Sequence, residues 1–246
     1  MADIKNLDKS KLKLIAFDLD GTLTQHKQPM DEKNHAMLVE LSKRYRLVMV
    51  GAGQTGRIFK QMEEFPIDII GNYGLQYAKY NHETKSLDVI RDESFPCDRE
   101  SVEKRADHIR EKYGYTTFAG DSVEYHPSGC ITLALLGTKA CQADKLAFDP
   151  DRVKRRRFYD EVVELFPEYN VFVGGSSSFD MAPKPYHKYY ALDLYCRENN
   201  LSHENVVFVG DDYGLGGNDE SVYRSDIAFL CVDDYREFAQ IAKCLL

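Results

Sequence analysis

Compact apolar runs alternate with amphipathic segments near the start of the chain. The runs at residues 12–17, 46–50 and 67–70 have the length and composition of buried strands. Residues 31–45 repeat apolar side chains at helical spacing, and residues 57–65 have the character of a short helix. This order of strand, helix, strand, helix, strand predicts a parallel sheet with right-handed crossovers.

The pattern changes after residue 77 and returns near residue 187. The middle segment predicts hairpins at 75–91 and 116–136, helices at 98–113 and 150–166, and strand character from 171 through 181. The last segment predicts helix 187–199, strands 206–209 and 227–230, and a terminal helix 234–245. We therefore expect an α/β core domain, residues 1–80 and 184–246, interrupted by an α+β domain at 81–183.

Composition narrows the class of protein. The chain has 246 residues and a formal net charge of -8, which disfavours nucleic acid and anionic membranes as partners. A small anionic substrate stays compatible, because a metal ion or local lysines reverse the field inside one cleft. The six cysteines form no Cys-x-x-Cys pair, and the N-terminus is polar, so we expect a cytoplasmic protein with reduced thiols. The basic run at 152–157 is expected to be a solvated helix face.

Carboxylates follow two of the predicted parallel strands. Asp18 and Asp20 come after the first strand, and Asp211, Asp212 and Asp219 come after the strand at 206–209. Open parallel sheets place their sites at the carboxyl ends of strands, where these groups would repel one another without a cation. Oxygen ligands with open water positions suit Mg²⁺, so the sequence predicts a magnesium site.

The spacing of the first pair indicates phosphoryl transfer. In an extended segment Asp18 and Asp20 point the same way, so one can attack phosphorus while the other donates a proton to the leaving oxygen. Gly21 and Thr22 allow a tight turn whose N–H groups can bind phosphate oxygens. A simple strand-ending turn would explain Asp20 and Gly21 but not the carboxylates at the second strand end.

The segment 17–24, Phe-Asp-Leu-Asp-Gly-Thr-Leu-Thr, resembles the first motif of the haloacid dehalogenase-like superfamily, most of whose members are aspartate-nucleophile phosphatases. Lys188 resembles the third-motif lysine, and residues 210–212 with 217–219 resemble the fourth motif, in the family's order. The resemblance implies a Rossmann-like α/β core with an inserted α+β cap. It implies these roles: Asp18 nucleophile, Asp20 acid/base, Lys188 charge partner of the phosphoaspartate, and Asp18, Asp20, Asp211, Asn218 and Asp219 the metal site.

The second motif departs from the family pattern, which places a Ser or Thr at the end of the second strand. Here residues 51–53 read Gly-Ala-Gly, and Thr55 is the first hydroxyl, so we expect Thr55 to take that role. Residues 51–56 also satisfy Gly-x-Gly-x-x-Gly, but no acidic residue follows the next strand to bind a ribose, which disfavours a dinucleotide site. Lys184 competes with Lys188, which is preferred because it opens a helix.

Within the superfamily, the chain resembles eukaryotic-type phosphomannomutases and, less closely, trehalose-phosphate phosphatases. The segment 174–180 resembles a phosphomannomutase cap strand, which implies that Ser178 and Asp180 contact a sugar phosphate. The cap arginines that grip the distal phosphate in that family are represented here only by Lys139 and Lys145. Lysine lacks the bidentate fork of arginine, which weakens a second phosphate site. This favours hydrolysis of the sugar phosphate over its isomerisation by a mutase.

We therefore expect a Mg²⁺-dependent phosphatase that hydrolyses a small phosphomonoester, a sugar phosphate, through a phosphoaspartate on Asp18. The expected partner is a phosphorylated metabolite, with no nucleic acid or membrane, and the protein is expected to be a monomer or small homo-oligomer. Two alternatives stay open: a phosphomannomutase-like hexose-phosphate mutase, and a non-catalytic metal-binding regulatory protein that kept the fold.

Overall fold

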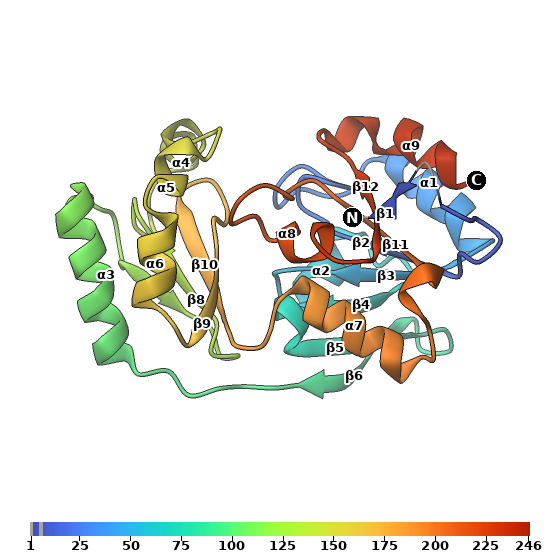
Figure 1. The fold of residues 1–246 in the computed structure, drawn as a ribbon, viewed down its shortest axis with the longest axis horizontal. Coiled ribbons are helices and arrows are strands. Elements are labelled where there is room, and N and C mark those ends of the chain that lie inside the picture. Colours follow the sequence, from blue (N-terminus) through green and yellow to red (C-terminus); the bar gives the residue numbers. More distant parts are fainter. Residues whose placement is uncertain (1, 5–6) are drawn as a thin grey trace. The chain divides into compact units, whose positions relative to one another are not determined.

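The computed structural model describes residues 2–4 and 7–246, which fall into two compact units (Figure 1). The core unit comprises Met1–Asp92, His187–Gly214 and Asp219–Leu246, and the cap unit comprises Glu93–Tyr186 and Leu215–Asn218. This division differs from the expected boundaries at 80/81 and 183/184. The hairpin at 76–92 stays with the core, because its strands continue the core sheet.

The core unit is built on an eight-stranded sheet in the order β1-β12-β11-β2-β3-β4-β5-β6. Its strands are β1 (Ala2–Asp3), β2 (Leu14–Phe17), β3 (Arg46–Val50), β4 (Asp68–Gly71), β5 (Gln76–Asn81), β6 (Ser86–Asp92), β11 (Val206–Gly210) and β12 (Ala228–Cys231). The first six in spatial order pair in parallel, and β5 and β6 add an antiparallel edge. The mixed α/β fold with a parallel sheet agrees with the sequence-based expectation.

Helices cover both faces of the core sheet (Figure 1). Helices α1 (Glu32–Ser42), α2 (Thr55–Gln61) and α9 (Phe238–Ile241) pack on the face that carries Ile15 and Phe17. Helices α7 (Lys188–Glu198) and α8 (Glu220–Tyr223) pack on the face that carries Leu14 and Ala16. Successive residues of one buried strand therefore pack against helices on opposite faces of the sheet. This explains why the apolar runs are uninterrupted.

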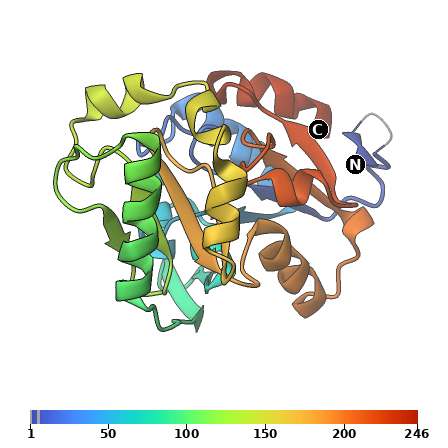
Figure 2. The same cartoon turned by 60° about the vertical axis from the view of Figure 1, so that its left-hand side comes forward.

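The cap unit is a four-stranded antiparallel sheet with helices on one face (Figure 2). Its strands are β7 (Val123–Tyr125), β8 (Ile131–Ala134), β10 (Ser178–Pro183) and β9 (Tyr169–Phe172), in that spatial order, and its helices are α3 (Arg99–Tyr113), α4 (Gln142–Phe148), α5 (Val153–Arg156) and α6 (Tyr159–Leu165). Ile131, Phe179 and Met181 pack with side chains of α3 and α6. Strand residues between them, such as Thr132 and Asp180, belong to the opposite face.

The helix expected at 150–166 is two short helices, α5 and α6, and the expectation of a solvated basic face is wrong for Arg155. The Arg155 side chain is fully buried, and its Nε donates to Asp149 Oδ2 at 2.9 Å. Its Nη1 also donates to the carbonyl oxygens of Gly174 and Ser178 at 2.5 and 2.8 Å. Burial of this charge is possible because a carboxylate and several carbonyls satisfy its donors.

The six cysteines, all within residues 7–246, are free thiols. Among the described residues, no helix combines the length and apolar character needed to cross a membrane.

Candidate active site

The site begins where β2 and β11 end side by side. These strands pair in parallel with Phe17 opposite Val209, so the residues that follow them emerge at the same edge of the sheet. The Asp18 N–H donates to the Val209 carbonyl oxygen at 2.9 Å and extends the pairing by one residue. Asp18 and Asp211 are therefore brought together by strand register.

A buried lysine joins the two strand-end segments. Lys188, the first residue of α7, donates from Nζ to Asp18 Oδ1 at 2.6 Å and to Asp219 Oδ1 at 2.7 Å. The exposed fractions of the three side chains are 0%, 5% and 0%, so little solvent screens these ion pairs. The Asp219 carboxylate also accepts the Asp212 N–H at 3.1 Å, which fixes its second oxygen. The lysine lies where it can balance charge on Asp18.

Three carboxylates converge next to this lysine. Oxygen atoms of Asp18, Asp211 and Asp219 all lie within 4.8 Å of one another. Burial raises the pKa of Asp18 well above its ordinary value, and the charges of Asp219 and Asp211 add to the rise while Lys188 opposes it. Burial and the charge of Asp219 likewise raise the pKa of Asp211 to about 7. Burial disfavours the Lys188 ammonium, but the charges of Asp18 and Asp219 outweigh it and raise its pKa.

The donor set fits a hard divalent cation. All three groups offer oxygen, and Lys188 brings a single positive charge to three clustered carboxylates. Asp211 is further oriented by the Thr22 hydroxyl, which donates to its Oδ1 at 2.8 Å. A Mg²⁺ held by Asp18, Asp211 and Asp219 would supply the missing charge and leave positions for water and a phosphoryl oxygen.

Asp20 lies outside the three-carboxylate cluster that the described residues form, in a hydrogen-bond network of its own. Its Oδ1 accepts the Lys27 N–H and the Gln61 side-chain amide, both at 2.7 Å, and Arg57 Nη1 lies 3.5 Å from its Oδ2. Burial raises the pKa of Asp20, but these hydrogen bonds with the charges of His26 and Arg57 outweigh it and lower the pKa overall. Asp20 as acid/base and as metal ligand both remain predictions.

Two glycines allow the close approach of the strand-end segments. Gly21 has φ +103°, and an added β carbon would lie 2.5 Å from Asp211 Oδ2. A β carbon on Gly210 would lie 2.6 Å from Asp219 Oδ2. A larger residue at either position would displace a carboxylate of the cluster.

The structure places the alternative residues differently. Thr55 begins α2, its N–H donates to Gln76 Oε1 at 3.1 Å, and its methyl group lies next to Gly71, so its expected phosphate contact stays a prediction. Lys184 belongs to the cap unit, where its N–H donates to the Glu168 carbonyl oxygen. Lys188 is the lysine that contacts Asp18.

The predicted substrate residues of the cap lie in two groups. Ser178 and Asp180 are neighbours on β10: the Ser178 hydroxyl lies 3.5 Å from Asp180 Oδ1, which also accepts from Thr132 Oγ1 at 3.0 Å. Lys139 is exposed and Lys145 is half-buried, with Lys145 Nζ donating to the Thr138 carbonyl oxygen at 3.1 Å. These four residues stay candidates for substrate binding.

Asn218, predicted as a metal-shell residue, belongs to the cap unit, whereas the next residue, Asp219, belongs to the core unit. Its predicted role is not tested by the geometry of the core carboxylates.

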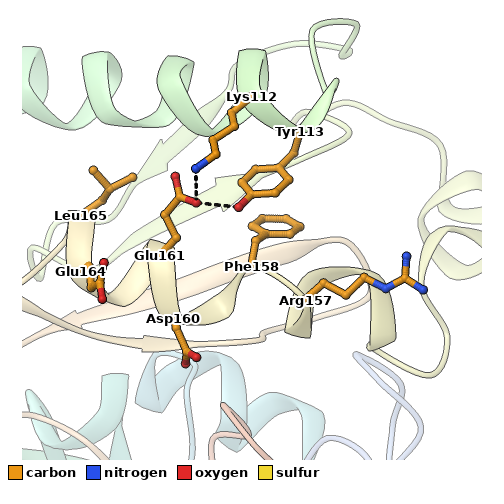
Figure 3. A pocket seen from close by; sticks show the side chains of 8 residues that line it. All are labelled: Lys112, Tyr113, Arg157, Phe158, Asp160, Glu161, Glu164 and Leu165. Carbon is orange, nitrogen blue, oxygen red and sulfur yellow. Dashed lines mark hydrogen bonds and ion pairs between the residues drawn. The ribbon is translucent and has the colours of Figure 1, made fainter.

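A depression of about 710 Å³ on the cap contains none of the predicted site residues (Figure 3). It lies between α3 and α6, and its wall is fixed by Glu161, whose Oε2 accepts from Lys112 Nζ and the Tyr113 hydroxyl, both at 2.6 Å. Lys112, Tyr113 and Glu161 pair with one another there, and the carboxylate cluster remains the candidate active site.

Sequence reasoning missed the side chains that surround Asp20 and Asp180. Gln61 and Arg57 sit one helical turn apart on α2, and Gln61 Oε1 accepts from Arg57 Nη1 at 2.7 Å. In the cap, His126 Nε2 lies 3.2 Å from Thr132 Oγ1. The sequence predicts a short helix after the loop at 51–53. Because such a helix starts at the carboxyl edge of the parallel sheet, its polar side chains are candidates for the site.

Known proteins resemble the chain in sequence over most of its length. The family described as eukaryotic phosphomannomutase matches residues 116–232. A phosphomannomutase of Encephalitozoon cuniculi is 27% identical, covering 94% of this chain and 93% of its own. A phosphomannomutase of Solanum lycopersicum is 28% identical, covering 88% and 87%. A probable phosphomannomutase of Caenorhabditis elegans is 24% identical, covering 87% of both chains.

Solved structures resemble the chain in fold. A Plasmodium falciparum IMP-nucleotidase mutant with bound IMP aligns with a TM-score of 0.73 at 17% identity, covering 98% of this chain and 70% of that one. A haloacid dehalogenase-like hydrolase from Bacteroides thetaiotaomicron aligns with a TM-score of 0.56 at 17% identity, covering 95% and 98%. The chain is therefore similar in fold to a haloacid dehalogenase-like hydrolase and similar in sequence to eukaryotic phosphomannomutases.

Proposed function

We propose that the chain is a hexose-phosphate mutase of the phosphomannomutase type, which transfers a phosphoryl group through a phosphoaspartate on Asp18. The observation that carries the proposal is the buried ion pair between Asp18, the proposed nucleophile, and Lys188. Relatives named phosphomannomutase match about nine-tenths of the length of the chain. From the sequence alone, lysine rather than arginine at positions 139 and 145 favours hydrolysis. The named relatives favour the mutase instead, and we adopt it as the main proposal.

The first half of the reaction uses residues of the core unit. Asp18 Oδ attacks a phosphorus of a hexose bisphosphate in a mutase, which leaves a hexose monophosphate, or the phosphorus of a sugar monophosphate in a phosphatase. In both cases the bond from phosphorus to the ester oxygen breaks, and Asp20 gives a proton to that oxygen. Asp20 is ionised in the free protein at neutral pH, since its pKa is lowered. The negative charge of a bound phosphate raises that pKa and favours uptake of the proton that the step needs. Lys188 stays beside Asp18 and balances charge on the phosphoaspartate.

The second half decides between mutase and phosphatase. In a mutase, a hydroxyl of the sugar phosphate attacks the phosphoaspartate, and Asp20 accepts its proton; a bisphosphate forms, turns round and returns one phosphoryl group to Asp18. In a phosphatase, water is the attacking group and inorganic phosphate is released. A bound Mg²⁺ would supply positive charge to the phosphoryl oxygens in either case.

The test follows mannose 1-phosphate with Mg²⁺ and a catalytic amount of hexose 1,6-bisphosphate by ³¹P NMR. The proposal expects mannose 6-phosphate to accumulate faster than inorganic phosphate, and it expects Asp18→Asn to abolish this conversion. Glu83→Gln, an exposed carboxylate at a hairpin tip, is the matched control and should keep full activity. Inorganic phosphate without the isomer would refute the mutase and support hydrolysis.

A phosphatase is the second candidate, because lysine at positions 139 and 145 gives a weaker distal phosphate grip than arginine. A metal-binding regulatory protein is the third. Tight Mg²⁺ binding by the three-carboxylate cluster, together with no phosphoenzyme from any sugar phosphate in a panel, would favour that third reading.

A further inference from the structure

The loop after β3 leaves a space above Gly53 that Arg57 fills. A β carbon added to Gly53 would lie 2.0 Å from Nη2 of Arg57 and 2.6 Å from its Cζ and Nε. The guanidinium therefore occupies the direction in which a side chain at position 53 would point. A phosphate-binding hydroxyl was expected at this strand end, and its place holds a charged donor instead.

Strand register brings this space next to the reacting groups. β2 and β3 pair in parallel with Phe17 opposite Met49, so the segments that follow them run side by side from Asp18 and Val50 onward. Nη1 of Arg57 lies 3.5 Å from Asp20 Oδ2, on the residue proposed to exchange a proton with the substrate oxygen. The guanidinium thus contacts the residue proposed to protonate the leaving oxygen, two positions after Asp18 in the chain.

The guanidinium is held at one nitrogen and available at the others. Nη1 donates to Gln61 Oε1 at 2.7 Å, and Gln61 in turn donates to Asp20 and to Thr24, which fixes its orientation. Within the described chain, the hydrogen bonds of Arg57 all leave from Nη1. Nη2 and Nε therefore keep three N–H groups, and the side chain is 39% exposed, so a ligand can reach them.

We propose that Arg57 is a catalytic residue whose Nη2 and Nε donate hydrogen bonds to the non-bridging oxygens of the phosphoryl group during its transfer to and from Asp18. Arg57 exchanges no proton: the bond from Asp18 to phosphorus forms, the ester bond breaks, and the leaving oxygen takes its proton from Asp20. A planar guanidinium matches two phosphoryl oxygens at once, which a single hydroxyl cannot do. The proposal rests on the proposed phosphoaspartate chemistry.

A binding measurement tests the proposal without turnover. Beryllium trifluoride with Mg²⁺ mimics a phosphoryl group on an aspartate, and its affinity is measured by titration calorimetry. Arg57→Ala should weaken binding about 10- to 100-fold, as for the loss of a hydrogen bond from a charged donor. Lys60→Ala, an exposed charge on the same helix, is the matched control and should bind like the unsubstituted protein.

A rescue variant tests the position of the donor. In Arg57→Ala/Gly53→Ser the new hydroxyl enters the vacated space, and it should recover about tenfold of the lost affinity. Gly53→Ser alone should bind more weakly than the unsubstituted protein, because its β carbon displaces the guanidinium. A double variant no tighter than Arg57→Ala would overturn the proposed position.

Kinetics separate catalysis from mere support of Asp20. The rate of phosphoenzyme formation is measured by rapid quench with a labelled hexose bisphosphate and with acetyl phosphate, whose leaving group needs little protonation. Asp20→Asn should lose rate mainly with the bisphosphate, whereas Arg57→Ala should lose it with both. If Arg57→Ala keeps its rate with acetyl phosphate, Arg57 only positions Asp20 and the proposal is wrong. Failure of the unsubstituted protein to bind beryllium trifluoride or form a phosphoenzyme would instead count against Asp18 as the nucleophile, and so against the proposed function.

Discussion

Substitution of Asp211 by Asn should make the metal-free protein more stable. Burial and the charge of Asp219 raise the pKa of Asp211 from 3.8 to about 7. Each pKa unit corresponds to about 1.36 kcal/mol, so ionised Asp211 costs the folded state up to roughly 4 kcal/mol. Asparagine removes the charge and keeps an oxygen for the Thr22 hydroxyl. Because the charge is shared with neighbouring carboxylates, we expect a gain of about 2–4 kcal/mol at pH 8 in EDTA.

The pH dependence of this gain follows from the sign of the shift. Above pH 7 Asp211 is ionised in both states, and the folded state bears the full cost. As pH falls below 7, folded Asp211 takes up a proton before the unfolded chain does, so the unsubstituted protein recovers stability. The advantage of Asp211→Asn should therefore shrink by about 1.4 kcal/mol per pH unit and vanish near pH 4. Saturating Mg²⁺ should reverse the order, since it stabilises the unsubstituted protein by about 2.7 kcal/mol at 100 times Kd.

The assay is urea unfolding followed by circular dichroism from pH 5 to 8.5, with and without EDTA. Hydrogen exchange of the β2 and β11 amides reports on the core unit alone. Glu83→Gln removes an exposed carboxylate from the same unit and serves as the control. If Asp211→Asn is no more stable than the unsubstituted protein at pH 8.5 in EDTA, the three carboxylates do not repel one another as their geometry indicates.

Three further predictions concern single groups. Lys188→Met should lower the free energy of unfolding in EDTA by about 3–5 kcal/mol, because it leaves buried carboxylates without their cation. In the same urea assay the loss should be smaller at pH 5 than at pH 8, and an equal loss at both would contradict this reasoning. Asp149→Asn should destabilise the cap unit by about 3 kcal/mol by leaving buried Arg155 unpaired, and faster hydrogen exchange confined to β9 and β10 would be the sign. Gly21→Ala should weaken Mg²⁺ binding measured by calorimetry, since its β carbon would lie 2.5 Å from Asp211 Oδ2; unchanged affinity would contradict the close packing.

The parallel part of the core could be predicted from sequence because its strands are short, mostly apolar, and separated by segments with apolar residues at helical spacing. Asp18 and Asp211 could be predicted as neighbours because both directly follow such strands. Their register then needs no long-range information beyond the strand order.

Other features of the fold and the site depend on contacts between distant parts of the chain and could not be predicted from sequence. The burial of Arg155 requires carbonyl oxygens at 174 and 178, which come together only when β10 is paired. The proposed role of Arg57 depends on its guanidinium filling the space beside Gly53, which is a feature of packing rather than of residue type. The strands of the hairpin at 76–92 mix polar and apolar residues, and sequence alone does not say which sheet they extend.

The assignment of residues 215–218 to the cap unit has a consequence for protein engineering. The Gly216 carbonyl oxygen accepts the Val173 N–H at 2.7 Å, and the Leu215 carbonyl oxygen accepts from Arg156 Nε at 2.9 Å. The cap unit is therefore not one continuous insert in the core unit. The backbone enters the cap unit a second time at Leu215 and leaves it after Asn218, directly before Asp219. A graft that exchanged only residues 93–186 would leave the loop without its partners, so a functional cap exchange has to include 215–218 as well.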